Sequence, residues 1–212
     1  MKPRWSFNVW ISFGFSLFTF CVLTLRPVPP AEAADSLAVS KPPRVLIQTG
    51  LADIELEIDH RSAPITATNF LRCVERGIYA GGSFHRTVTL SNQPANKVKI
   101  EVIQGAANPA KTNEFLPAIK IERTRDTGLK HLDGTISMAR DGPDTAQDEF
   151  FICIGDQPEL DFGGKRNPDG QGFAAFGKVT KGMDVVRRIQ TSSADGQKLT
   201  PAIRIQRAVR LN

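Results

Sequence analysis

Three short runs of the sequence place a cation or a carboxamide among apolar and aromatic residues of strand-like character. The first run ends at Arg86, the second contains Gln104, and the third ends at Arg140 and precedes a Phe-Phe pair. Guanidinium and carboxamide groups offer hydrogen bonds of fixed direction, and aromatic rings offer apolar surface. Such residues suit chemistry by hydrogen bonding and apolar contact, with no nucleophile. The runs are Phe84-His85-Arg86, Val102-Ile103-Gln104-Gly105 and Ser137-Met138-Ala139-Arg140, and the third is followed by Phe150-Phe151-Ile152-Cys153.

Other kinds of chemistry lack the residues that they need. The three scattered histidines, and the two cysteines outside an apolar N-terminal stretch, are too few for a zinc cluster or a disulfide scaffold. The Gly-x-Ser-x-Gly pattern of hydrolases and a phosphate-binding glycine loop are absent from the sequence. Without Lys2, Arg4, Arg26 and Glu32, the formal charge falls from +5 to +3, too weak and scattered for a nucleic-acid groove. We therefore expect no metal, no cofactor and no nucleic-acid partner.

Residues 1–33 have the features of a secretory signal peptide. A short positive start is followed by an uncharged apolar stretch over 5–25 and an Ala-x-Ala site at 31–33. We expect cleavage there and export, to the periplasm in a bacterium. About 20 apolar residues also span a bilayer, so an uncleaved leader would instead anchor the protein in the membrane. Residues 34–43 are predicted to form an extended linker, and 44–212 the folded domain.

The remaining sequence predicts many short strands and two helices. Residues 54–58 alternate apolar with acidic side chains, which is typical of a strand with one buried face. Pro64 suits a first helical turn, Cys73 falls on the buried face of this helix, and Gly77 ends it. This pattern favours a mainly β antiparallel barrel or sandwich. Further strands are predicted at 45–49, 83–87, 99–103, 135–140, 149–154, 174–179 and 203–211, and the second helix at 183–190.

Long loops are predicted at 88–98, 105–118 and 161–173, between the expected strands. Long ordered loops in a compact domain usually carry function. We therefore expect some of these loops to contribute to the site.

Taken in order, these motifs resemble the cyclophilin family of peptidyl-prolyl cis/trans isomerases over nearly all of residues 44–211. The resemblance implies a closed eight-stranded antiparallel barrel capped by two α-helices, in agreement with the strand pattern. It also implies an exported bacterial isomerase, expected to be a monomer, that acts on proline-containing segments of unfolded or exported proteins. The matching runs are Asn69-Phe70-Leu71, Phe84-His85-Arg86, Gly134–Ala139, Glu149–Cys153, Phe176–Val179 and Gly182–Val186.

Rotation about a prolyl bond is slow because the C–N bond has partial double-bond character, with a barrier of about 18–20 kcal/mol. The resemblance implies that Arg86 donates a hydrogen bond to the proline nitrogen, whose lone pair is freed as the amide twists. Gln104 would bind the substrate backbone and position Arg86, and Phe151 would form the floor of the proline pocket. The other implied substrate-binding residues are Val102 and Leu160 as apolar walls, Ala139 and Arg140 beside the flanking residues, and Phe173 in place of the family's pocket histidine.

The sequence departs from the family pattern at the edge of this pocket. Glu101 and Val102 occupy the neighbourhood of a Phe that often precedes the glutamine, and an inserted loop spans 162–172. Glu159 replaces a Trp whose indole N–H binds cyclosporin in sensitive members. An ionised carboxylate accepts hydrogen bonds but donates none, so we expect low sensitivity to cyclosporin.

Two other functions are compatible with a barrel of this kind. The first is a prolyl-peptide-binding or chaperone module with little turnover, although the retained pair of Arg86 and Gln104 favours the enzyme. The second is a carbohydrate-binding barrel, which would expose stacking aromatic rings. Outside the leader, Tyr79 is the only Trp or Tyr in the sequence, which argues against this second alternative.

Overall fold

The structure, a computed structural model, describes residues 41–211, so the predicted leader and most of the linker lie outside the described residues. Within 41–211, no helix combines the length and the apolar character needed to cross a membrane. The strands are β1 (Arg44–Thr49), β2 (Asp53–Ile58), β3 (Ser83–Val88), β4 (Val102–Ala106), β5 (Thr135–Met138), β6 (Phe150–Cys153), β7 (Ala174–Lys181), β8 (Ala194–Asp195) and β9 (Lys198–Arg210). The helices are α1 (Pro64–Glu75), α2 (Thr124–Thr127) and α3 (Met183–Gln190), with 3-10 turns η1 (Pro109–Glu114) and η2 (Pro158–Leu160).

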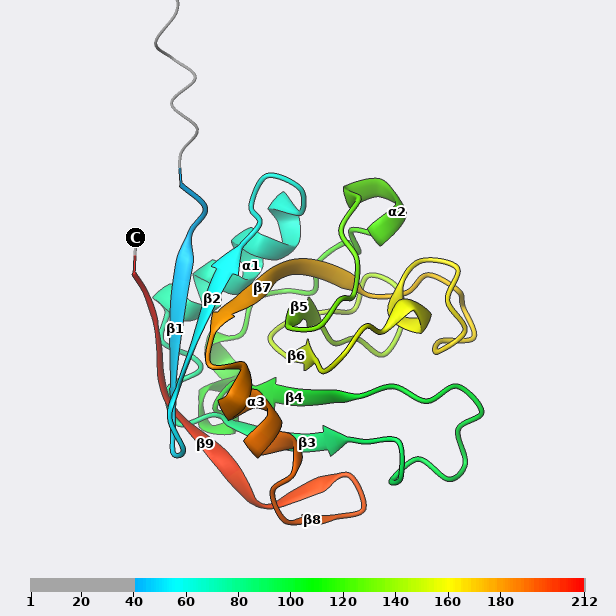
Figure 1. The fold of residues 1–212 in the computed structure, drawn as a ribbon. Helices are drawn as coiled ribbons and strands as arrows, with labels where there is room; N and C mark the ends of the chain where they lie inside the picture. The colour runs from blue at the N-terminus through cyan, green and yellow to red at the C-terminus, as the bar shows by residue number, and fades with distance from the viewer. Residues whose placement is uncertain (1–40, 212) are drawn as a thin grey trace, which may run out of the picture. The chain divides into compact units, whose positions relative to one another are not determined.

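Eight of the strands pair edge to edge and close into a barrel (Figure 1). Their order is β1-β2-β7-β5-β6-β4-β3-β9, and β9 pairs back onto β1. Each of these pairings is antiparallel. The predicted closed eight-stranded antiparallel barrel is therefore confirmed, with the two-residue strand β8 added beside β9.

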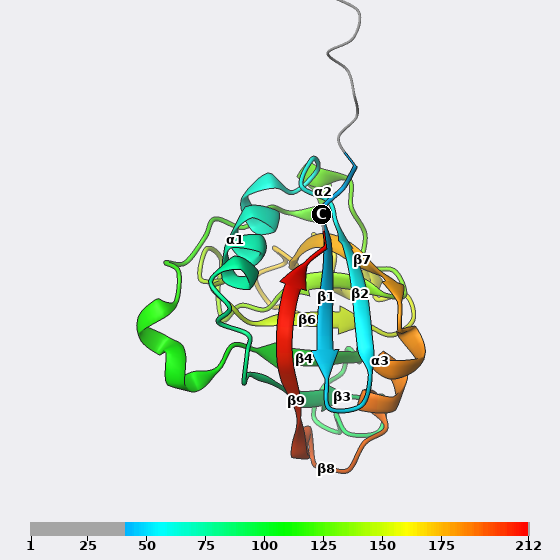
Figure 2. The same cartoon turned by 90° about the vertical axis from the view of Figure 1, so that its left-hand side faces the viewer.

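The helices α1 and α3 lie at opposite ends of the barrel (Figure 2), as the predicted capping helices should. Phe70 of α1 enters the core, where its ring centroid lies 5.5 Å from that of Tyr79, 5.6 Å from Phe150 and 5.1 Å from Phe176. All four rings are almost fully buried. Cys73 is fully buried on the same helix, as predicted, and burial raises the pKa of its thiol to about 12.

Strand β4 begins at Val102, so the predicted strand over 99–103 is displaced toward the C-terminus. The reason is that side chains take the hydrogen bonds of the preceding backbone. Gln93 Nε2 donates to the carbonyl of Ile100 at 2.7 Å, and the amide of Ile100 donates to Gln93 Oε1 at 3.3 Å. The amide of Glu101 donates to Gln157 Oε1 at 3.2 Å. The carbonyl of Glu101 still accepts a hydrogen bond from the amide of Ile154 at 3.0 Å, just beyond β6, but regular pairing with β6 begins at Val102.

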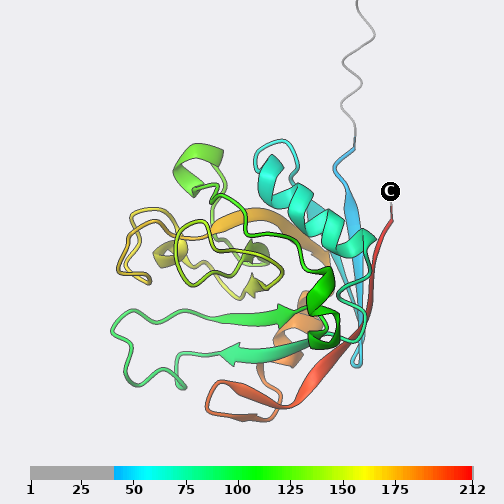
Figure 3. The same ribbon diagram turned by 180° about the vertical axis from the view of Figure 1, so that it is seen from behind.

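Strand β9 is longer than the predicted strand over 203–211, because pairing with two other strands extends it. Its first part pairs with β8 and with the end of β3, where Lys198 lies opposite Arg86. Figure 3 shows the loops 89–101 and 161–173 reaching out on one side of the barrel, the side that carries the candidate site. They correspond to the long loops predicted at 88–98 and 161–173.

Candidate active site

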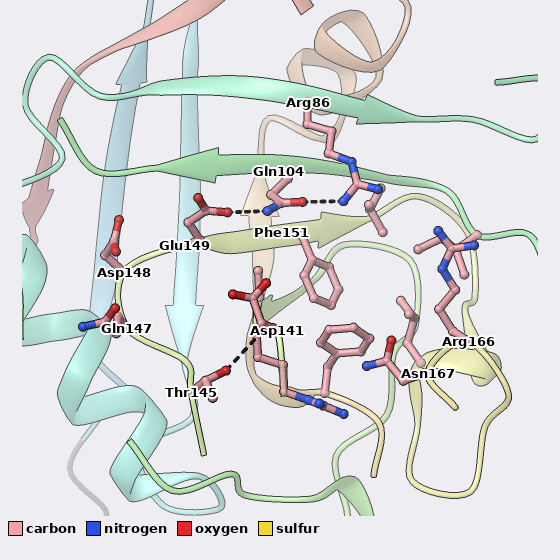
Figure 4. A pocket seen from close by; sticks show the side chains of 16 residues that line it. Arg86, Gln104, Asp141, Thr145, Gln147, Asp148, Glu149, Phe151, Arg166 and Asn167 are labelled. Atoms are coloured by element: carbon pink, nitrogen blue, oxygen red, sulfur yellow. Dashed lines mark hydrogen bonds between the residues drawn. The ribbon is translucent and has the colours of Figure 1, made fainter. Parts of the chain in front are cut away.

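All eight site residues predicted from the sequence line one cavity of about 390 Å³ (Figure 4). The cavity lies on the outer face of the barrel wall, because side chains along a strand alternate between the two faces. In β6, Phe150 packs in the barrel core, whereas Phe151 belongs to a separate apolar cluster that faces the cavity. In β4, Ile103 points into the core, and Val102 and Gln104 point into the cavity.

A β-bulge turns the side chain of Arg86 out of the barrel. Phe84 pairs with Gly105, whereas Arg86 pairs with Gln104, so His85 is an extra residue in β3. Without the bulge, Arg86 would share the inward face of Phe84, since alternate residues of a strand face the same way. Gly105 helps at the same place, because a Cβ there would lie 3.0 Å from the Phe150 ring and 3.1 Å from the Phe84 ring.

Two glutamines hold the Arg86 guanidinium. Nη1 donates to Gln104 Oε1 at 2.8 Å, while Nε and Nη2 donate to Gln197 Oε1 at 2.9 and 2.6 Å. Gln104 in turn donates to Glu149, and Gln197 donates to the carbonyl of Asn92 at 3.1 Å. Both carboxamides are therefore fixed in orientation. Because a guanidinium has five N–H groups, two remain for a ligand.

The Arg86 guanidinium is half-buried and has no ion pair with a carboxylate of residues 41–211. Burial lowers its pKa, and the negative charge of Glu149 opposes this shift. Arginine nevertheless stays protonated in proteins, so the cavity contains a permanent, oriented positive charge.

Sequence analysis did not identify Gln197 as a site residue. It lies 111 positions after Arg86 in the chain, in the turn between β8 and β9. Asp195-Gly196 is a turn signal that could have located this hairpin, but nothing in the sequence indicates that its next residue contacts Arg86.

The apolar part of the cavity is built around Phe151. Leu160 and Val102 are buried beside it, and the ring of Phe173 meets that of Phe151 edge to face at 5.2 Å. The imidazole of His131 stacks on Phe151 with 6.0 Å between centroids and 16° between planes. A flat aromatic surface with apolar walls suits a prolyl ring.

His131 is part of a buried hydrogen-bonded Ser-His-Asp set beneath Phe151. Its Nδ1 lies 2.8 Å from Asp161 Oδ1, and its Nε2 lies 3.0 Å from Ser137 Oγ. Ser137 is fully buried, so a substrate carbonyl could not reach its hydroxyl as in a hydrolase. The set instead fixes the ring on which Phe151 stacks.

Ala139 and Arg140 line the cavity at the end of β5, but the Arg140 guanidinium also anchors the inserted loop. It binds Asp169 at 2.7 and 3.0 Å and the carbonyl of Gly172 at 2.9 and 2.6 Å. Its Cζ atom also lies 5.1 Å from the centre of the Phe173 ring. This guanidinium therefore helps to hold the loop and Phe173 in place.

Glu159 is not among the residues that line the cavity. Its carboxylate accepts a hydrogen bond from the amide of Lys165 at 2.7 Å and so holds the inserted loop. Arg166 and Asn167 from this loop line the cavity, and sequence analysis identified neither of them. Within 41–211, no group of three His, Cys, Asp or Glu side chains could hold a metal ion.

A closed antiparallel barrel with an arginine and an apolar pocket on its outer wall defines a cyclophilin-like fold. A solved structure of a Cryptosporidium parvum cyclophilin-type peptidyl-prolyl cis-trans isomerase matches it with a TM-score of 0.63 at 23% identity. The match covers 80% of this chain and 98% of that chain.

Sequence comparison gives the same family. The model for cyclophilin-type peptidyl-prolyl cis-trans isomerases matches residues 44–210. The chain is 35% identical to peptidyl-prolyl cis-trans isomerase A of Dickeya dadantii, over 85% of this chain and 87% of the relative. It is 36% identical to a peptidyl-prolyl cis-trans isomerase of Acinetobacter baylyi, over 68% of this chain and 70% of that relative. The chain therefore belongs to the cyclophilin-type peptidyl-prolyl cis/trans isomerases, and the predicted enzyme class is confirmed.

Proposed function

We propose that this isomerase acts at the cavity around Arg86 on proline-containing segments of exported proteins. The observation that carries the proposal is the Arg86 guanidinium, which keeps two N–H donors without a partner among residues 41–211, beside the Phe151 floor. A prolyl ring seated on Phe151, between Val102 and Leu160, would lie within reach of these donors. A structure of the Cryptosporidium parvum relative in the presence of the dipeptide Ala-Pro supports a proline-containing ligand.

Arg86 would act on the twisted amide more than on the planar one. In the planar amide the nitrogen lone pair is delocalised into the carbonyl, whereas rotation localises it and makes it a hydrogen-bond acceptor. A donor that is already oriented needs no reorganisation at that moment and is worth roughly 3–4 kcal/mol. Because this interaction forms in the transition state, it accelerates the reaction instead of only tightening binding.

Gln104 would connect the substrate backbone to Arg86. A carboxamide has two N–H donors and two acceptor lone pairs. The bonds with Arg86 and Glu149 use one of each. The remaining donor and lone pair are available for the peptide backbone, while Ala139 and Arg140 would border the residues that flank the proline.

Turnover of a proline peptide, measured by NMR exchange spectroscopy, tests the site. We expect Arg86→Ala to remain folded and to lose about 100-fold or more in kcat/KM, which corresponds to the loss of one such donor. Near-full turnover by the folded variant would contradict the mechanism. Peptide binding by the wild type without turnover would favour the alternative, a binding or chaperone module.

The export of this enzyme is supported by the signal-like features of residues 1–33 and is tested separately. After expression of the full chain in a bacterium, we expect a periplasmic protein whose N-terminus begins next to the Ala-x-Ala site. Recovery of the intact N-terminus in the membrane fraction would support the anchor instead, and a cytoplasmic protein would exclude both forms of export.

A further inference from the structure

Besides Arg86 and Arg140, the cavity contains a third guanidinium, that of Arg166, which the isomerase mechanism does not use. Arg166 and Asn167 lie at the end of the cavity opposite Asp148 and Glu149 (Figure 4). Arg166 Nη1 donates to Gln93 Oε1 at 2.9 Å and to the carbonyl of Val98 at 2.7 Å. Among residues 41–211, its Nε and Nη2 have no hydrogen-bond partner and no carboxylate pairs with it. Three of its five N–H donors therefore remain available.

The backbone beneath Arg166 is held firmly. The amide of Arg166 donates to the carbonyl of Glu159 at 3.2 Å, and the neighbouring Lys165 amide binds the Glu159 carboxylate. At Gly172, where φ is 65°, a Cβ would lie 2.5 Å from a backbone carbon of Asp161, so the loop packs directly against the turn at η2. A guanidinium fixed in this way loses little conformational freedom when it binds a ligand.

The lining carboxylates Asp141, Asp148 and Glu149 all lie away from Arg166 (Figure 4), which leaves the Arg166 end of the cavity positive. Arg140 is neutralised by Asp169, whereas Arg86 and Arg166 lack an ion pair within the described chain. Burial lowers the pKa of Arg166, and the positive charge of Arg86 lowers it further. Two guanidinium groups that repel each other across an apolar pocket would both be stabilised by one incoming anion.

We propose that Arg166 forms an anion subsite which selects proline-containing peptides with an Asp or Glu side chain close to the proline. The carboxamide of Asn167 has no partner among residues 41–211 and adds a neutral donor beside it. The inference rests on the proposed function of the cavity and names its substrate class. Arg166 takes no part in bond rotation, since its role is to bind a carboxylate of the substrate.

The test compares kcat/KM for pairs of peptides that differ only in one Glu or Gln. The peptides carry acetyl and amide ends, so that no terminal charge interferes. The variable residue is placed in turn at each of the two positions before the proline and each of the two positions after it. For the wild-type full chain at low salt we expect a Glu-to-Gln ratio of about fivefold at one position or more. The ratio should fall toward one in about 0.5 M salt, because ions screen exposed charges.

Variants identify the group responsible. Arg166→Gln should bring the ratio to about one, Arg166→Lys should keep part of it, and Arg166→Glu should favour a Lys peptide over its Gln counterpart. Lys165→Gln is the matched control, because it removes the same charge from an exposed neighbour that does not line the cavity. This variant should keep both the ratio and the turnover of the wild type.

A wild-type ratio of one at all four positions would overturn the anion subsite, as would a ratio that persists in a folded Arg166→Gln variant. Loss of the ratio in Lys165→Gln would equally overturn it, since the effect would then reflect net charge. Failure of the isomerase function looks different, because the neutral Gln peptides would also show no turnover. In that case NMR titration with the Glu and Gln peptides decides the subsite through their Kd values.

Discussion

Gln197→Leu should slow the isomerase without unfolding it. The substitution replaces a carboxamide by an apolar side chain of similar size and removes the oxygen that accepts hydrogen bonds from Arg86 Nε and Nη2. Arg86 then keeps one described bond, from Nη1 to Gln104. Its side chain would leave the orientation needed at the proline nitrogen for part of the time. Gln197 is thus a positioning residue, which acts on the substrate through Arg86.

The size of the effect follows from these bonds. Hydrogen bonds to charged groups contribute about 1.5–3 kcal/mol, and the lower end applies because Arg86 and Gln197 are partly exposed. A loss of about 1.5 kcal/mol from the transition state corresponds to roughly tenfold in kcat/KM. The loss should appear mainly in kcat, since Gln197 does not line the cavity that receives the peptide. Arg86→Ala, which removes the donor itself, should be at least tenfold worse.

The assay is NMR exchange on a proline peptide, with thermal unfolding to verify the fold. Gln206→Leu is the matched control, because Gln206 is exposed on β9 and far from Arg86 in the strand register. Gln197→Glu should recover part of the turnover, since its carboxylate accepts the same bonds from Arg86 but cannot donate to the carbonyl of Asn92. Wild-type turnover in a folded Gln197→Leu variant would refute the reasoning, as would a failure of Gln197→Glu to recover any activity.

Three further predictions follow from the cavity and its supports. Phe151→Ala should weaken peptide binding, measured by NMR titration. It should also lower the free energy of unfolding, measured in urea, by roughly 3–5 kcal/mol, as for other buried aromatic residues. Unchanged values would show that Phe151 neither forms the floor of the pocket nor stabilises the fold. At Asp161, burial raises the pKa, but hydrogen bonds and charge from His131 outweigh burial and leave the pKa below its usual value. The stability that Asp161 contributes should therefore be complete above pH of about 4 and decline as the pH falls through its lower folded value, and urea unfolding of Asp161→Asn should lack this component. Cyclosporin should inhibit weakly, because Glu159 offers no donor and binds the Lys165 amide instead; tight inhibition in the NMR assay would contradict this.

Local sequence determined most of the elements. The alternation in 54–58 and the helical spacing after Pro64 depend on near neighbours, and both elements lie where they were predicted. The helix over 183–190 has the bounds expected from its apolar spacing. The order of the motifs was sufficient to predict the family and the closed barrel, because each motif keeps its place relative to the others along the chain.

Strand limits depended on partners that lie far away in the sequence. The side chains of Gln93 and Gln157 take most of the backbone hydrogen bonds of Ile100 and Glu101, so β4 begins later than its apolar residues suggest. Lys198 belongs to a strand because β3 and β8 lie beside it, although its own sequence has no clear alternation. The residue pattern within one segment cannot predict strand limits that depend on hydrogen bonds with distant segments.

The sequence by itself determined which residue types the site contains, and the tertiary structure decided how they are arranged. Arg86 faces the cavity only because His85 is bulged out of the pairing with β4, which depends on register and not on residue type. Arg166 reaches the cavity from an inserted loop, and Gln197 reaches Arg86 from a hairpin, although no motif in either segment indicates the contact. Periodicity reports which residues share a face of one element, whereas closure of the barrel alone brings separate elements to one site.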